Sequence, residues 1–417
     1  MILNYISYID IFRLVFLFIL LINSTKYKNI KEINLEHKIL RFNKYCKRYS
    51  FQLNENMEDK LFSYLNYTRF IKNTRNQTLI EYNSENEPKI SFVSPVFNKE
   101  NYLHTLIKSI QIINIEDFEI IFIDDSSEDN SINIINNFMK NDRRIKLIKN
   151  KINRGSLYSR ALGAFNSKGD YIIFVDSDDI IISEGISKAY KYISSQNLSL
   201  IQYNSLIQIN NRIFINHYYE KFKNIIITQP LLSYIFYFNN STSEEKNAGL
   251  WDKIIKKEIV LKSINYIGMN YLGKNIKIEN DVILLFSILQ NSQSYQYIDD
   301  IGYYYIRSNL GSISNSWKNP KIANEIIKSI LITIDFLYEK SGNSFLDKKI
   351  CISKLRKSFK RFKNCFKYIE RGIQLTKNLF NKLLNSQYIL NKDKLTIIKI
   401  ELEILSIQES SRYLSKY

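Results

Sequence analysis

Four apolar runs that alternate with helix-like segments restrict what this chain can fold into. The runs are rich in β-branched and aromatic residues, as buried strands are, and they read KISFVSPVFN, FEIIFIDD, IKLIKN and YIIFVDSDD. Apolar or small residues at helical spacing fill the intervals, and we predict helices over Glu100–Asn114, Ser131–Met139 and Leu157–Phe165. Strands that alternate with helices of roughly ten residues form βαβ units and a parallel sheet. The sequence therefore predicts an α/β domain.

Acidic residues lie directly after two of these runs. Asp124 and Asp125 end the second run, and Asp176, Asp178 and Asp179 end the fourth. In open parallel sheets, ligands bind beyond the carboxyl ends of the strands. Carboxylates this close repel one another unless a cation lies between them, and their oxygens suit hard ions such as Mg²⁺ or Mn²⁺. We interpret the fourth run as a strand that delivers metal ligands; a solvated loop that begins with Asp is the alternative.

Glycine loops that cradle phosphates in other nucleotide-binding proteins are absent from the sequence. No GxGxxG follows any run, which disfavours a dinucleotide-binding domain, and GxxxxGK[ST] is missing too. The chain carries 59 Lys and Arg against 41 Asp and Glu, a net charge of +18. This excess favours an anionic partner, which could be a nucleotide, a membrane surface or a nucleic acid. No nucleic-acid recognition motif is present, so we expect no nucleic-acid partner.

Cysteine and histidine usage excludes two further classes. The three cysteines, Cys46, Cys351 and Cys365, form no CxxC, and only three histidines accompany them. A structural zinc site and a disulfide-built fold are therefore disfavoured.

The two ends of the chain differ in character from the middle. The run Leu14–Ile22 has the length of a signal-peptide core, and we predict a signal peptide or membrane anchor over residues 1–25, with a buried helix as the alternative. Lysines after the run favour a cytoplasmic bulk, whereas a secretory protein needs the opposite. We expect membrane association or the secretory pathway, with the side of the membrane undecided.

Residues 26–88 form the predicted stem, and residues 319–417 a basic helical region. In that region a basic amphipathic helix extends from Ile352 to Ile373; it could lie on an anionic membrane, although packing on the preceding domain is the simpler interpretation.

Six segments in a fixed order resemble a known family. They are ISFVSPVFNKENYLHTLIKSI, FEIIFIDDSSEDNS, NRGSLYSRALGAFNSKGDYIIFVDSDD, WDKIIKKEIV, IENDVILLFSIL and YYYIRSNLGSIS. Together they resemble glycosyltransferase family 2, whose members have the GT-A fold and transfer a sugar from a nucleotide donor. The resemblance implies a mixed, mostly parallel, Rossmann-like sheet over residues 89–318, with a donor half at 89–200 and an acceptor half at 201–318.

The resemblance assigns donor and metal roles to residues of the first half. Asp176 and Asp178 match the DxD motif, so Mn²⁺ or Mg²⁺ is the expected cofactor, with Asp178 the preferred ligand. The metal would bridge the two phosphates of the donor. The remaining donor-binding positions implied by the motifs are Pro95, Val96, Asp124, Asp125, Asn153, Gly155 and Arg160.

On the acceptor side, the family has a Glu-Asp pair before a helix, and this chain has Glu279-Asn280-Asp281. Asp281 takes the position of the catalytic base, which would deprotonate an acceptor hydroxyl with inversion at the sugar. Asn280 departs from the family pattern, although Glu279 stands one residue earlier. Helix capping by Asp281 is the structural alternative. Trp251 resembles an acceptor-side residue, with a core role as its alternative.

The sequence thus predicts an inverting, metal-dependent glycosyltransferase that acts on a glycan, lipid or protein acceptor. A membrane surface is a further partner to consider. Two other classes stay open. A catalytically inactive, membrane-associated GT-A protein would keep the fold, but loss of the acidic pair would be expected in it. A DxD phosphohydrolase would use its first Asp as a nucleophile on the first strand of its domain, whereas this DxD follows the fourth.

Overall fold

The computed structural model describes residues 87–209, 212–216, 224–229, 232, 249–306, 320–340, 381, 384 and 385. The predicted signal segment, nearly all of the stem and most of the C-terminal region, including the basic helix, lie outside these residues. Within the described ranges, no helix is both long enough and apolar enough to cross a membrane.

A ten-stranded sheet forms the centre of the molecule, in the order β3-β2-β1-β4-β9-β6-β10-β5, with β7 paired to β6 and β8 to β10. The first half of the sheet is parallel, because β2 pairs with β1 and β3, and β1 with β4, in the same direction. The second half adds antiparallel ladders through β9, beside one further parallel pair of β6 and β10. The strands are β1 Ile90–Val96, β2 Phe118–Asp124, β3 Ile145–Lys149, β4 Tyr171–Phe174, β5 Ile180–Ile181, β6 Leu200–Ile209, β7 Arg212–Asn216, β8 Ile226–Thr228, β9 Lys253–Lys256 and β10 Ser294–Ile306.

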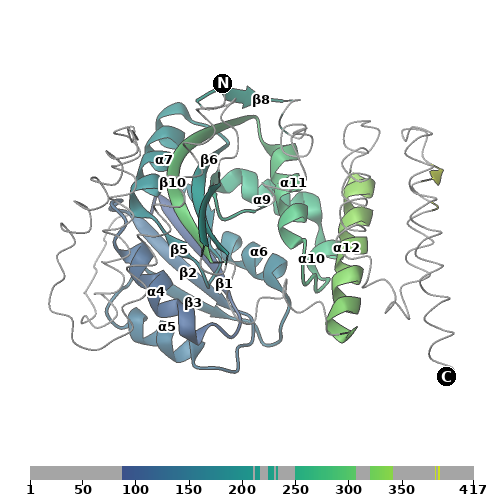
Figure 1. The fold of residues 1–417 in the computed structure, drawn as a ribbon, viewed down its shortest axis with the longest axis horizontal. Helices are drawn as coiled ribbons and strands as arrows, with labels where there is room; N and C mark the ends of the chain where they lie inside the picture. Colours follow the sequence, from purple (N-terminus) through teal and green to yellow (C-terminus); the bar gives the residue numbers. More distant parts are fainter. Residues whose placement is uncertain are drawn as a thin grey trace, which may run out of the picture.

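Helices cover both faces of this sheet (Figure 1). Helices α4 and α5, with α7, bury their apolar sides against one face, and α6, α9, α11 and α12 pack on the other. Strands with both faces covered read as continuous apolar runs, which is why the four runs were recognisable in the sequence. The helices are α4 Glu100–Gln111, α5 Ser131–Met139, α6 Ser156–Asn166, α7 Ser183–Gln196, α9 Lys257–Ile267, α10 Met269–Leu272, α11 Asn280–Asn291 and α12 Pro320–Lys340.

Helix α12 begins where the sequence predicted the C-terminal region to begin. It packs on α11, and its Ile332, Phe336 and Leu337 belong to the same buried cluster as α6 and α9 (Figure 1). The Lys277 amide, in the segment before α11, donates a 3.0 Å hydrogen bond to Ser329 Oγ on α12. This first helix of the C-terminal region therefore completes the core of the sheet domain.

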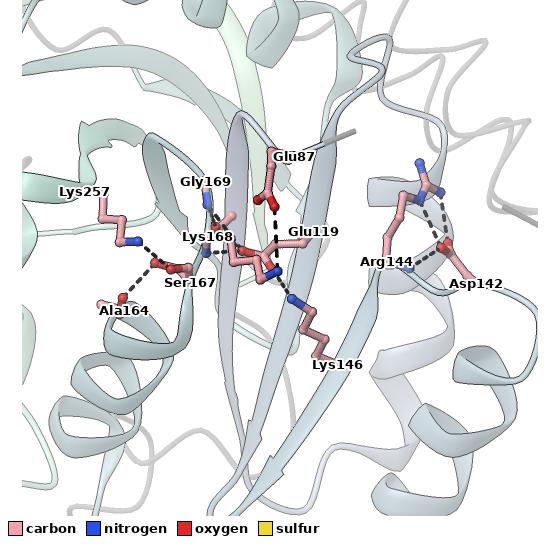
Figure 2. A network of polar contacts seen from close by, with 11 residues as sticks. Glu87, Glu119, Asp142, Arg144, Lys146, Ala164, Ser167, Lys168, Gly169 and Lys257 are labelled. Atoms are coloured by element: carbon pink, nitrogen blue, oxygen red, sulfur yellow. Dashed lines mark hydrogen bonds and ion pairs between the residues drawn. The ribbon is translucent and has the colours of Figure 1, made fainter. Parts of the chain in front are cut away.

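A buried carboxylate fastens the amino ends of the parallel strands (Figure 2). Glu119 Oε1, at the start of β2, accepts hydrogen bonds from Ser91 Oγ on β1 at 2.6 Å and from the Lys168 amide at 2.5 Å. Its Oε2 accepts from Lys146 Nζ on β3 at 2.5 Å. A Cβ on Gly169, the next residue along, would lie only 2.7 Å from backbone atoms of Ile90 and Ser91. One acid and one glycine thus hold three strands and the α6–β4 turn in register.

Candidate active site

One pocket of about 440 Å³ opens at the carboxyl ends of β1, β2 and β4, the edge at which the sequence placed a ligand. A cavity of this size suits a small organic ligand, since ligand pockets hold roughly 300–1,000 Å³. Most of the predicted site residues meet there: Pro95, Val96, Asp125, Asn153, Gly155, Arg160, Asp176, Asp178, Glu279 and Asp281 line it. Asp124 and Trp251 do not line the pocket.

The first acidic pair has a structural task. Asp125 Oδ1 accepts hydrogen bonds from Asn150 Nδ2 at 2.8 Å and from the Arg154 amide at 2.9 Å, and its Oδ2 accepts from the Gly155 amide at 2.8 Å. Asp124 is buried, and both of its carboxylate oxygens lie 3.3 Å from the Ser127 amide. These carboxylates therefore fix the loops that form the wall of the pocket.

Gly155 is the residue at which that loop turns into α6. Its φ of 87° lies in the region that favours glycine, and an added Cβ would lie 3.0 Å from Asn275 Oδ1. The side chain of Asn275 therefore occupies the space beside Gly155, so the loop before α6 and the segment before α11 close the pocket together.

Arg160 connects the DxD segment to the predicted base. Its guanidinium, 5% exposed, donates to Asp176 Oδ1 at 2.8 Å and to Asp281 Oδ1 at 2.6 Å. A further hydrogen bond reaches Asn280 Oδ1 at 2.5 Å. Although burial alone would lower the pKa of Arg160, the charges of Asp281 and Asp176 raise it, so the cation is secure. The sequence predicted Arg160 as a donor-binding cation; the structure places it between two acids at the pocket wall.

The DxD segment itself carries acids in unlike surroundings. Burial raises the pKa of Asp176 to about 6, against the opposing effect of Arg160 and with further increases from Asp281 and Asp178. Burial raises the pKa of Asp179 well above its ordinary value, and the charges of Asp178 and Asp176 add to this. Asp178 is instead in an ion pair, because Lys99 Nζ lies 2.7 Å from its Oδ2.

Tyr303 on β10 forms hydrogen bonds with the DxD segment. Its hydroxyl accepts a hydrogen bond from the Asp176 amide at 3.1 Å and donates one to Asp179 Oδ2 at 2.9 Å. Asp179 Oδ1 also accepts from the Ile306 amide at 2.8 Å. Burial raises the pKa of Tyr303 well above its ordinary value, so its proton remains available for this bond. Asp179 therefore ties the end of β10 to the segment that precedes β5.

Asp281 lies in the first turn of α11, where Glu279 is the residue at the N-cap. Because the helix already begins at Asn280, Asp281 is not its N-cap residue, and the capping alternative for Asp281 is wrong. Glu279 has a φ of 66°, a left-handed conformation that costs a non-glycine residue free energy and that concentrates at functional sites. This turn directs Asp281 and Glu279 to the pocket.

Most of the residues that build the pocket are similar to those of a known protein family. The family model described as Glycosyl transferase family 2 matches residues 91–257. These residues belong to glycosyl transferase family 2. The pocket residues from Pro95 to Asp178 fall within the match, whereas Asp281 follows it.

Curated relatives and solved structures agree with the family. An uncharacterized glycosyltransferase of Haemophilus influenzae is 40% identical over 113 residues, which are 27% of this chain and 45% of the relative. The poly(ribitol-phosphate) beta-N-acetylglucosaminyltransferase TarP of Staphylococcus aureus is 29% identical over 253 residues, 58% of this chain and 72% of TarP. The chain thus spans less than half the length of the first of these relatives.

A solved structure shows the fold. Residues 1–349 of S. aureus TarS, crystallised with UDP-GlcNAc, match with a TM-score of 0.57 at 17% identity, over 78% of this chain and 92% of that chain. The family 2 domain of this protein has the GT-A fold, as the order of its motifs predicted.

Trp251 is placed differently from the acceptor-side residue that its motif suggested. Its indole stacks on Tyr303 and on Tyr305, with ring centroids 4.7 Å and 5.3 Å away and interplanar angles of 23° and 18°. Its backbone carbonyl accepts a 2.6 Å hydrogen bond from the hydroxyl of Tyr203. In this family 2 domain, Trp251 supports β10 from outside the pocket, which favours the core alternative.

Sequence reasoning missed several residues that line the pocket. Lys99 and Lys277 are the missed cations, and Phe97 was missed as well, although it stands inside the quoted SPVFN run. The remaining lining residues are Ser156, Ser177, Ile276, Ile278 and Asn280. Only the position of Lys99, one residue before a helix and opposite a strand-end acid, could have indicated its pairing.

The residues present fit a divalent metal. Asp176 and Asp178 face one pocket, and Mg²⁺ in particular is commonly held by one or two carboxylates together with substrate phosphates and water. In the part of the chain that the structure describes, no group of three or more His, Cys, Asp or Glu side chains gathers as a metal site. Asp176 and Asp178 are the residues that would hold such an ion.

Proposed function

We propose that this protein is an inverting, metal-dependent glycosyltransferase that moves a sugar from a nucleoside-diphosphate donor to an acceptor hydroxyl. The proposal rests on one observation: the guanidinium of Arg160 forms ion pairs with both Asp176 of the DxD and Asp281. Arg160 thereby keeps the group that would hold the donor's diphosphate close to the group that would take a proton, in one small pocket. A nucleoside-diphosphate sugar bound at the DxD would then bring its anomeric carbon near Asp281.

Asp281 is the proposed catalytic base. Its Oδ1 is engaged by Arg160, which leaves Oδ2 for the proton of an acceptor hydroxyl. The acceptor oxygen then bonds to the anomeric carbon, while the bond from that carbon to the diphosphate oxygen breaks and its electron pair leaves with the diphosphate. Attack from the face opposite the leaving group inverts the configuration. Positioned base catalysis of this kind contributes about 10²- to 10⁴-fold in rate.

Cations of the chain would stabilise the leaving group. Lys99 and Lys277 line the pocket beside the DxD and in the segment before α11. Positive charges aimed at the place where negative charge develops are worth far more in a small, partly dry site than in water. A divalent metal at Asp178, with Asp176 beside it, would supply further neutralisation of the diphosphate.

Relatives suggest where a search for the donor should begin. TarP is named as a beta-N-acetylglucosaminyltransferase, and TarS was crystallised with UDP-GlcNAc. A beta product made from an alpha-linked sugar nucleotide requires inversion, which agrees with a single base opposite the leaving group. UDP-sugars are therefore the first donors to test for this chain.

The proposal is tested by calorimetry of the full-length chain with a panel of UDP- and GDP-sugars, each with and without Mn²⁺. We expect one donor to bind only with the metal, and Asp178→Ala to abolish that binding, because even changes to residues behind a ligand cost about 10- to 100-fold in metal affinity. Asp170→Ala is the matched control: it removes a 68%-exposed carboxylate from the opposite end of the same strand.

Two outcomes would overturn this function. A folded wild-type sample that binds no donor in the panel would leave the inactive GT-A alternative. Donor binding that Asp178→Ala and Asp170→Ala change equally would show that the DxD does not hold the diphosphate.

A further inference from the structure

An ion pair occupies the DxD carboxylate that the metal is expected to use. Lys99 Nζ lies 2.7 Å from Asp178 Oδ2, and the two side chains are only 20% and 19% exposed. Ion pairs on the surface of this domain are more exposed to solvent: the side chains of Lys188 and Glu184, for example, are about half exposed. The partial enclosure of Lys99 and Asp178 makes their attraction stronger than that of a solvated pair.

The backbone of Lys99 is held firmly while its side chain is long enough to move. The Lys99 amide donates a 2.8 Å hydrogen bond to Ser131 Oγ, and the neighbouring amides of Asn98 and Glu100 donate to Ser127 and Asp129. The loop between β1 and α4 is thus fastened to the start of α5. A flexible stem of four methylene groups separates this anchored backbone from the ammonium. The ammonium of Lys99 can therefore move from Asp178 to another anion without movement of the loop.

The charges of the pocket suggest when that exchange would occur. Five carboxylates and three cations line the pocket, so it is moderately negative when Lys99 is paired with Asp178. Entry of a nucleoside diphosphate adds negative charge near Asp178 and gives the ammonium phosphate oxygens to bind. An ammonium and a divalent cation cannot both use Asp178 Oδ2, so the pairing of Lys99 competes with the metal until such an anion arrives.

We propose that Lys99 is a built-in counter-cation that withholds Asp178 from a divalent metal until a nucleoside diphosphate enters, and then turns to the diphosphate. The inference rests on the proposed function. Its consequence is ordered assembly: the chain by itself binds the metal weakly, and metal and nucleotide tighten each other's binding. Reciprocal tightening follows because any coupling between two ligands acts equally on both.

The test measures Mn²⁺ binding to the full-length chain by electron paramagnetic resonance, without donor or turnover. Lys99→Met removes the competing ammonium but keeps an unbranched side chain, and we expect it to bind Mn²⁺ about fivefold more tightly than the wild type in the absence of nucleotide. Lys99→Arg keeps a cation at the position and should stay near the wild-type affinity. With saturating UDP, the advantage of Lys99→Met should vanish, and its affinity for UDP should fall.

Lys277→Met is the matched control, because it removes one positive charge from the same pocket. Within the described ranges, the Lys277 ammonium makes no ion pair, so it has no carboxylate to release. A general change in the field of the pocket would tighten Mn²⁺ binding equally in both Met variants; the proposal requires the larger effect in Lys99→Met. Circular dichroism and thermal melting establish that each variant is folded.

The outcomes separate this inference from the function on which it rests. Equal Mn²⁺ affinities of wild type and Lys99→Met without UDP, or equal tightening in the two Met variants, would overturn the role of Lys99 even where UDP binds normally with Mn²⁺. Failure of the wild type to bind either UDP or GDP under any condition would instead count against the glycosyltransferase. If neither wild type nor Lys99→Met binds Mn²⁺, with or without UDP, both the role of Lys99 and the metal dependence are wrong.

Discussion

Two clusters of charge lie at opposite ends of the same parallel strands, and they are built in opposite ways. At the amino ends, Glu119 is 3% exposed as a side chain, and both of its oxygens accept from donors that the fold supplies (Figure 2). At the carboxyl ends, Asp176 and Asp281 are each 30% exposed and face a pocket. The first cluster is closed, and the second is open on one side.

The difference also appears in the cations. Lys146 reaches Glu119 from the surface, with 42% of its side chain exposed. Arg160 is buried, and its Nε is one of three buried side-chain polar atoms that lack a hydrogen-bond partner in the described part of the chain. A buried donor without an acceptor costs free energy that a structural cluster would avoid. The carboxyl-end cluster is therefore organised for a ligand, and the amino-end cluster for the fold.

The sharpest way to break this comparison is Asp281→Asn. The amide keeps an oxygen for Arg160 but cannot take a proton, so we expect sugar transfer to fall about 10³-fold. Donor binding should stay near that of the wild type, and stability should fall by less than on loss of Arg160, because the hydrogen bond to Arg160 is kept. Turnover and calorimetry on the same sample check this, and retained turnover would remove Asp281 from the role of base.

Arg160→Met should damage both stability and activity. It leaves two partly buried acids, Asp176 and Asp281, without their shared cation, and breaking a buried pair of this kind costs about 3 kcal/mol in the free energy of unfolding. Urea denaturation measures the loss. A variant of unchanged stability would mean that water, and not Arg160, balances the two acids.

Glu119→Gln should lower stability but spare the site. Ser91 and the Lys168 amide would lose a charged acceptor. A hydrogen bond to a charged group contributes about 2 kcal/mol to the free energy of unfolding. We expect about that loss in urea denaturation, with donor affinity unchanged. Reduced donor affinity at equal fold content would show that the two ends of the strands are coupled.

The pH dependence of that loss sharpens the comparison further. Burial would raise the pKa of Glu119, but hydrogen bonds from Lys146, Ser91 and the Lys168 amide together bring it below the ordinary 4.5. An acid whose pKa is lower in the folded state contributes stability above its unfolded pKa and loses it as the pH falls through the folded one. The stability difference between wild type and Glu119→Gln should therefore be full at pH 7 and shrink below about pH 4.5. A difference that is constant with pH would contradict the ionised state of Glu119.

Lys188→Met supplies the baseline for both clusters. Lys188 pairs with Glu184 at 2.9 Å and Asp300 at 3.1 Å, but its side chain is 48% exposed. Exposed pairs contribute about 0.5 kcal/mol, so the unfolding midpoint should hardly move. A loss as large as that of Glu119→Gln would show that burial does not separate structural from surface pairs in this protein.

Local patterns made much of the fold predictable. The first helices and strands of the GT-A domain lie within a few residues of their predicted bounds. Strands buried on both faces appear in the sequence as continuous apolar runs, and the helices that cover them appear as apolar residues at helical spacing. Helix α12 also begins at Pro320, one residue after the predicted start of the helical C-terminal region. Such signals come from neighbouring residues and need no knowledge of the tertiary structure.

Contacts between residues far apart in the sequence could not be predicted from local patterns. Arg160 meets Asp281 across 121 positions of sequence, and Tyr303 meets Asp179 across 124. Nothing local distinguishes an arginine that binds phosphate from one that bridges two acids. Trp251 shows the same limit, since the tyrosines that cover it lie on β10. The motif order located the site, whereas the partner of each side chain required the folded chain.

The segment of residues 276–281 closes the pocket from beyond the family match, which ends at residue 257. The wall that carries the DxD and the wall that carries Asp281 are therefore separately exchangeable parts of one chain. A chimera joined near residue 257 would keep the proposed nucleotide side of one protein and take the proposed acceptor side of another, provided that α11 still packs on α6 and α9. If the proposed function holds, changes in the segment of residues 276–281 would alter the acceptor and leave the donor side of the pocket unchanged.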